Sequence, residues 1–286
     1  MNKKILISLS IIGAVAAIAI GGTVAYFSDT ETSTGNTFTA GSIDLKVDNH
    51  CYLNDKECVY VQDKGYYWDG EVMNGNECSC TWDLTDLDGE LFFNFSDLKP
   101  GDWGEDTVSL HVYNNDAWVC VTFDNLKSLD NTCTEPEGED ECNTPGTGCC
   151  DEPGELAGEL NFVFWADVCD DTGLEATPGD NIYQPSCDIL LMQGPASDLV
   201  GQDPVTYTLA DSQENNVGGT GALVGGDTYY IGKLWCFGDL VSYENGNIDC
   251  DGSQVDNSSQ TDSLTGDIIF YAEQARNNTN FVCSQP

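Results

Sequence analysis

The sequence predicts an all-β protein, a jelly-roll-like β-sandwich with disulfide-rich loop insertions. Apolar residues alternate with polar ones in many short runs, and clusters rich in Gly, Asp, Asn and Pro separate these runs. The chain of 286 residues also carries 14 cysteines. Alternation with a period of two is typical of strands that bury one face. Eight to ten such strands in one chain favour a sandwich or a jelly roll.

The strands are expected in a regular order along the chain. In the first of them the apolar residues Ile43, Leu45 and Val47 alternate with polar neighbours. Further strands are expected at 91–95, 107–112, 119–123, 160–168, 205–209, 228–237 and 267–275. We expect all of them in one β-sandwich domain spanning 26–286.

Two segments break the alternation and are expected to be insertions on that domain. Residues 49–82 are irregular and rich in Cys, Gly and Tyr. Residues 129–156 carry four cysteines and three prolines without an apolar period. Segments this polar cannot form a core of their own, so we expect acidic, Cys-rich surface loops.

The first 25 residues have the composition of a secretory signal peptide. Lys3 and Lys4 precede an apolar run over 5–20, and small residues lead to Ala25. This order predicts cleavage before Tyr26 and a protein that is secreted, either extracellular or held at the cell surface. The alternative is an uncleaved anchor, because the segment is just long enough to span a bilayer. If the signal peptide is cleaved, we expect the protein to contact the membrane only through this segment and only before cleavage.

The chain is strongly acidic, with 49 Asp and Glu residues against nine Lys and Arg. Removal of Lys3 and Lys4 with the leader leaves seven basic residues and a formal charge of −42. These cations are scattered, whereas binding to nucleic acid or to an anionic membrane needs a basic patch. The composition therefore excludes those partners and is typical of a soluble surface in high salt or high calcium.

All 14 cysteines follow the leader. An even number of cysteines in an exported protein predicts up to seven disulfides, whose pairing the sequence leaves open. The chain has no Cys-x-x-Cys pair, which argues against a zinc cluster.

The sequence offers little that points to catalysis. Its two histidines, His50 and His111, do not belong to a His-Glu-x-x-His motif, and no Gly-x-Ser-x-Gly motif is present. We therefore expect no enzymatic activity.

One short acidic stretch could bind a metal ion. Its carboxylates surround a turn glycine, Gly89, and belong to Asp83, Asp86, Asp88 and Glu90. Oxygen ligands at short spacing beside a turn suit calcium, although the spacing is not that of an EF-hand. The alternative is a solvated turn.

Two stretches resemble the TasA and camelysin (CalY) family. They are "AYFSDTETSTGNTFTAGSIDLKV" at 25–47 and "FSDLKPGDWGEDTVSLHVYNNDAWVCVTF" at 95–123. The resemblance implies a SipW-type signal peptide and a jelly-roll subunit of extracellular biofilm fibres. The family is also described as metallopeptidases, but this chain shows no zinc ligands for that activity. Its 14 cysteines and acidic insertions depart from the family pattern.

The leader lies directly beside a strand, and this suggests how subunits could assemble. A strand donated by one subunit can complete the sheet of the next, and such a contact does not close, so it generates a filament. The expected assembly strand includes Tyr26, Phe27, Phe38, Ile43, Leu45 and Val47.

Two functions follow from this reasoning. The first is a secreted structural subunit of a fibre or biofilm matrix, with copies of itself and other matrix components as partners. The second is a monomeric cell-surface adhesin or binding module. For the N-terminal segment itself, the alternative to a donated strand is that residues 26–40 form a flexible stretch before a strand paired within its own chain.

Overall fold

The computed structural model describes residues 28–33, 37–39, 44–132, 153–172, 176–202 and 204–283. Fifteen strands lie in these ranges, with one short α-helix, α3 (Leu156–Glu159), and one 3-10 turn, η1 (Ala196–Asp198). The prediction of an all-β protein is confirmed. No helix in these ranges is long and apolar enough to cross a membrane.

One sheet has five antiparallel strands. Their order is β11 (Val205–Ala210), β8 (Ala117–Leu129), β15 (Ser263–Gln274), β1 (Ser28–Ser33) and β2 (Thr37–Thr39). The centre of this sheet is the long pairing of β8 with β15, which runs from Ala117 opposite Gln274 to Leu129 opposite Ser263. The N-terminal strands β1 and β2 therefore extend the sheet from its β15 side.

The second sheet has eight strands. Its order is β10 (Ile189–Pro195), β9 (Leu160–Ala166), β12 (Thr228–Phe237), β7 (Trp103–Tyr113), β3 (Asp44–Leu53), β4 (Lys56–Val61) and β5 (Gly65–Trp68), and β6 (Trp82–Thr85) also pairs with β3. A small separate ribbon joins β13 (Asp239–Ser242) to β14 (Asp249–Asp251).

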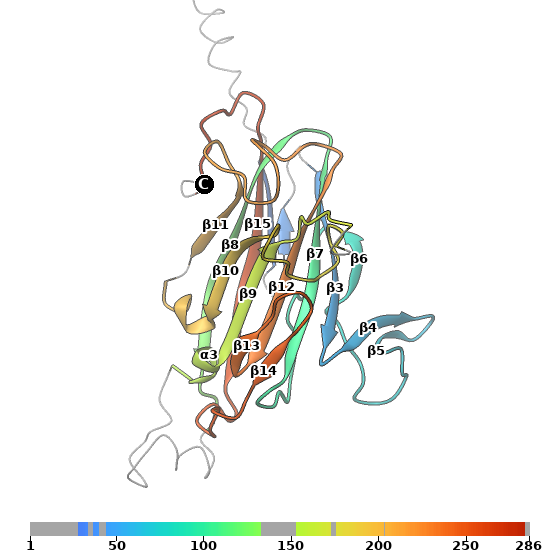
Figure 1. Cartoon of the computed structure of the whole chain (residues 1–286), viewed down its shortest axis with the longest axis vertical. Helices are drawn as coiled ribbons and strands as arrows, with labels where there is room; N and C mark the ends of the chain where they lie inside the picture. The colour runs from blue at the N-terminus through green and yellow to red at the C-terminus, as the bar shows by residue number, and fades with distance from the viewer. Residues whose placement is uncertain are drawn as a thin grey trace, which may run out of the picture.

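The two sheets pack face to face and form one apolar core (Figure 1). Leu45 and Val47 reach it from β3, and Val119 and Phe270 reach it from β8 and β15. Their side chains are almost fully buried. Burial of a side chain of this size contributes about 1.5–3 kcal/mol, so the alternating residues of both sheets stabilise the sandwich together.

The strand expected at 91–95 does not form, and these residues run as an irregular segment. The segment is held by its aromatic side chains. Phe92 packs against Trp82 with ring centroids 5.0 Å apart, and Phe93 packs against Phe162 at 5.5 Å. Phe92 is thus buried, and Phe93 partly buried, by edge-to-face packing without strand pairing.

The first expected insertion is more regular than the sequence suggests. Residues 49–82 include the end of β3 and the hairpin of β4 and β5, which stands out from the side of the sandwich in Figure 1. Asp63 takes a positive φ in the hairpin turn, a conformation that Asp tolerates better than most residues. Most of the second insertion, residues 133–152, lies outside the described residues.

Candidate functional site

The candidate assembly site is the edge of the five-stranded sheet at β15. Strand β1 pairs antiparallel with β15, with Ser28 opposite Glu273 and Ser33 opposite Ile268. Strand β2 pairs only with β1 in the sheet order. Without β1, therefore, the outer edge of β15 would present a row of unpaired amides and carbonyls over this stretch.

The sequence of β1 is entirely polar. The strand reads Ser-Asp-Thr-Glu-Thr-Ser and has no apolar residue. Each main-chain hydrogen bond in its pairing with β15 is worth about 0.5–1.5 kcal/mol net. Any other strand that offers the same backbone in the same register can replace these bonds.

The residues expected in the assembly strand lie in different places. Leu45 and Val47 belong to β3, where both side chains are fully buried in the core of their own chain. Phe38 lies in β2, opposite Glu31 of β1. The other expected residues, Tyr26, Phe27 and Ile43, lie outside the described residues. Leu45 and Val47 are therefore part of the core of their own chain.

The four acidic residues proposed for calcium lie near β6, and the structure gives two of them protein partners. Lys46 Nζ lies 2.9 Å from Asp86 Oδ2. Glu90 Oε2 accepts a hydrogen bond from the backbone N–H of Asp88 at 2.6 Å. No three His, Asp or Glu ligand atoms within the described ranges lie within 4.8 Å of one another. Calcium binding at Asp83, Asp86, Asp88 and Glu90 stays a prediction.

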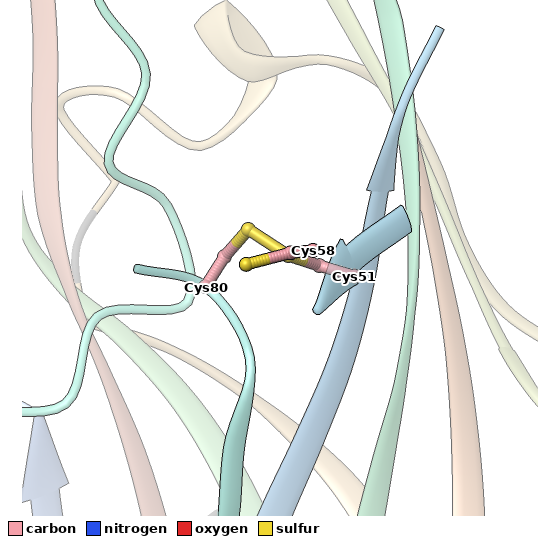
Figure 2. A group of neighbouring side chains, drawn as sticks. All are labelled: Cys51, Cys58 and Cys80. Carbon is pink, nitrogen blue, oxygen red and sulfur yellow. A yellow bond between two sulfur atoms is a disulfide. The ribbon is translucent and has the colours of Figure 1, made fainter. Parts of the chain in front are cut away.

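The group of side chains with metal-ligand spacing consists of cysteines. Figure 2 shows Cys51, Cys58 and Cys80, whose sulfurs lie within 4.8 Å of one another. Cys51 is bonded to Cys80, and Cys58 is bonded to Cys78. A metal is bound by the thiolate, so these oxidised sulfurs fasten the hairpin of β4 and β5 and offer no ligand.

The prediction of disulfides is confirmed for every cysteine that the structure describes. The three further bonds are Cys120–Cys283, Cys169–Cys187 and Cys236–Cys250. The other four cysteines, Cys133, Cys142, Cys149 and Cys150, lie outside the described residues.

Each histidine contacts a carboxylate on a neighbouring strand. His111 Nε2 lies 2.8 Å from Asp48 Oδ2, and its Nδ1 lies 3.0 Å from the hydroxyl of Thr228. His50 Nε2 lies 2.8 Å from Glu57 Oε1. A zinc peptidase needs three protein ligands around one ion. These two histidines belong to separate side-chain pairs, and neither is part of a three-ligand group in the described ranges.

A buried polar group within the eight-stranded sheet was missed by the sequence reasoning. Lys233 of β12, Asp106 of β7 and Asn49 of β3 are each at most 1 % exposed. The signal was a lysine in the middle of the apolar run at 228–237. Lysine is almost never fully buried without a partner, so its position in that run pointed to a hidden carboxylate.

A partly open cleft of about 1420 Å³ is lined by residues from both sheets and from the loops beside them. Its walls include Phe92, Phe93, Phe123, Leu126, Phe162 and Leu264. Polar and acidic side chains, among them Asn125, Asp256 and Asp262, line the rest of the cleft. An apolar wall with polar groups beside it is typical of small-molecule binding sites.

These features define an antiparallel β-sandwich protein whose N-terminal strands complete one sheet and whose hairpin insertion is fastened by disulfides. Residues 1–63 match the family model of camelysin metallo-endopeptidase, which confirms the resemblance to the TasA and camelysin family over that segment. The match includes β1, β2 and β3. No curated protein matches the chain.

Proposed function

We propose that the protein is a secreted structural subunit of an extracellular fibre or biofilm matrix, and that it assembles by donor-strand exchange of its N-terminal segment. The observation that carries this proposal is the pairing of β1 with β15. The strand has no apolar residue, so its release carries no apolar side chain of its own into water.

Strand exchange between subunits keeps the contacts that β1 makes with β15 within a single chain. If β1 of one copy pairs with β15 of the next, the backbone hydrogen bonds are the same in number and register as within one chain. The free energy of pairing is then nearly equal in the two forms, and a high local concentration favours the exchanged form. The contact joins two different surfaces and does not close on itself, so repetition generates a filament.

The signal peptide would prevent this exchange until it is cleaved. While residues 1–25 hold the N-terminus at the membrane, the segment beside them has limited freedom to reach a neighbour. Cleavage by a signal peptidase then frees β1 and secretes the subunit. The match of residues 1–63 to the camelysin family supports this proposal, because it includes both the leader and the exchangeable segment.

The acidity of the subunit sets a condition for assembly. A formal charge of −42 after cleavage makes neighbouring subunits repel one another, so counter-ions must screen or bridge them. Calcium held by Asp83, Asp86, Asp88 and Glu90 is the cation we propose for this role. Carboxylates of two subunits can share such an ion.

A monomeric adhesin or binding module is the second candidate function. The cleft of about 1420 Å³ favours it, because a cleft with aromatic and aliphatic walls is typical of a ligand-binding site. In that case the protein would bind an apolar ligand or a surface and would remain monomeric at high concentration.

Electron microscopy of the purified mature protein separates the two functions. We expect filaments from the mature chain and single particles from a variant that lacks residues 26–40. A synthetic peptide of residues 26–40 should bind the shortened variant, since it restores a strand at β15. Single particles from the intact mature chain under all conditions would support the binding module.

A further inference from the structure

Three buried side chains from adjacent strands meet within the eight-stranded sheet, where β12, β7 and β3 lie side by side (Figure 1). Lys233 Nζ lies 2.7 Å from Asp106 Oδ2. The side-chain amide of Asn49 donates a hydrogen bond to the same carboxylate oxygen, at 3.1 Å. One oxygen of Asp106 therefore contacts both the lysine nitrogen and the asparagine nitrogen.

The surroundings of this group are apolar and aromatic. Lys233 Nζ lies 3.8 Å from the ring centroid of Phe93 and donates a hydrogen bond to the carbonyl of Phe92 at 3.1 Å. The amide of Asn49 also donates to the carbonyl of Cys80. These contacts hold the three buried side chains in one arrangement, away from bulk water.

Burial changes the protonation of the group. It raises the pKa of Asp106 and lowers the pKa of Lys233, because loss of hydration disfavours the charged form of each. Their mutual attraction opposes both shifts. The neutral amine and the protonated carboxyl therefore become accessible, and a neutral lysine amine is a nucleophile.

We propose that Lys233 and Asn49 form an intramolecular amide cross-link, with Asp106 relaying the proton. The lone pair of Lys233 Nζ attacks Cγ of Asn49, and a new N–C bond forms. A proton from Nζ passes to Asp106, and a proton from Asp106 passes to Nδ2 of Asn49. The bond from Cγ to Nδ2 then breaks and ammonia leaves. The exchange of one amide for another needs no oxidant, reductant or cofactor.

The geometry favours Asn49 over Asp106 as the partner of Lys233. The carboxylate oxygen touches both the attacking and the leaving nitrogen, which is the position of an acid and base. Condensation of Lys233 with Asp106 would consume the group that carries the proton. Oδ1 of Asp106 has no hydrogen-bond partner within the protein, so it is available to take up a proton.

The cross-link would join β3 to β12 across β7. It would tie the strand that follows the exchangeable N-terminal segment to the middle of the sheet. The core would then stay intact when β1 moves. The reaction needs only the folded core of a single chain. The cross-link can therefore be tested whether or not the protein forms fibres.

Mass spectrometry of the full mature protein, reduced and denatured, tests the proposal directly. We expect a mass lower than that of the sequence by one ammonia molecule. Trypsin should fail to cut after Lys233, and the peptide 47–56 should be recovered joined to the peptide 128–276. An unchanged mass with cleavage after Lys233 would overturn the proposal. So would loss of ammonia without the joined peptides.

A matched pair of variants assigns the atoms. Asn49→Ala should have the full mass of its sequence and should be cut after Lys233. Asn161→Ala, which changes an asparagine of the neighbouring strand β9, should keep the joined peptides. Loss of one water molecule with a link between Lys233 and Asp106 would overturn the assignment to Asn49.

Discussion

Cys120 in β8 forms a disulfide with Cys283, which lies 163 positions further along the chain. The bond joins the segment after β15 to strand β8, which lies between β11 and β15 in the five-stranded sheet. In the chain-entropy model, closing a loop of this length stabilises the fold by about 5 kcal/mol. The bond between Cys236 and Cys250 closes a loop of only 14 positions and should contribute about 3 kcal/mol.

The first prediction compares these two disulfides. Replacement of Cys120 and Cys283 by Ala should lower the free energy of unfolding more than replacement of Cys236 and Cys250. Urea denaturation of both double variants, without reductant, measures the difference. A larger loss in the variant of the short loop would show that local packing around the bond matters more than chain entropy.

The second prediction concerns the pH dependence of stability. Burial raises the pKa of Asp167 to about 7, against the effect of hydrogen bonds from the backbone of Asn181 and Gly179. The unfolded chain gives up this proton near pH 4. The folded state therefore binds more protons between about pH 4 and pH 7, and the free energy of unfolding falls as the pH rises through that range.

Asp167→Asn tests this prediction. The variant keeps an acceptor for the N–H of Asn181, which bonds Asp167 Oδ2 at 2.8 Å, but it cannot ionise. It should be more stable than the wild type at pH 8, with a shallower decline between pH 4 and pH 7. Some decline should remain, because burial also raises the pKa of Glu105 to about 7. Asp63→Asn, in the hairpin turn, is the control. If the wild type, Asp167→Asn and Asp63→Asn lose stability identically with pH, Asp167 is not the group responsible for the decline.

The third prediction concerns a close contact in β12. A Cβ atom added to Gly232 would lie 2.0 Å from the ring of Trp165 on β9, which is itself buried. Gly232→Ala should therefore destabilise the fold by about 1–3 kcal/mol, the usual cost of overpacking. Gly158→Ala in α3 meets open space and should be neutral or slightly stabilising. Equal melting temperatures for the two variants would show that Trp165 moves aside freely.

The fourth prediction concerns cations and assembly. At equal ionic strength, millimolar calcium should promote fibre formation more than sodium chloride, because a divalent ion bridges carboxylates that sodium only screens. Replacing Asp86 and Asp88 by Asn should weaken the difference. Light scattering on both proteins is the measurement. Equal assembly in the two salts would mean that the acidity serves solubility.

The alternating strands were predictable because one face of each is buried. The run expected at 228–237 has the bounds of β12, and the run at 160–168 contains β9. The prediction of a strand at 91–95 was wrong. Phe92 and Phe93 are held by ring contacts, and the sequence does not distinguish apolar residues held in this way from those of a paired strand. Short strands such as β13 have too few residues to show a period.

The site was less predictable than the fold. The presence of disulfides followed from the number of cysteines, whereas the partner of Cys120 lies too far along the chain to be found from spacing. The group at Lys233 depends on the register of three strands, which brings residues from distant parts of the sequence together. A buried lysine could be suspected, but not its neighbours.

Disulfide trapping across the β1 edge tests donor-strand exchange most directly. Thr32 of β1 lies opposite Ile269 of β15, and Ile269 lies opposite Thr122 of β8. Residues opposite each other in antiparallel strands have Cα atoms about 4.5–5.5 Å apart, a distance that a disulfide spans. A disulfide between cysteines at 32 and 269 therefore shows whether β1 comes from the same chain or from a neighbour. Cysteines at 122 and 269 are the control, because they lie in strands of the same chain.

The measurement is a non-reducing denaturing gel of each double variant, oxidised after assembly. The account predicts a ladder of covalently linked chains for Thr32→Cys with Ile269→Cys, and monomers for Thr122→Cys with Ile269→Cys. Monomers from both variants, in samples that contain fibres, would contradict donor-strand exchange through β1.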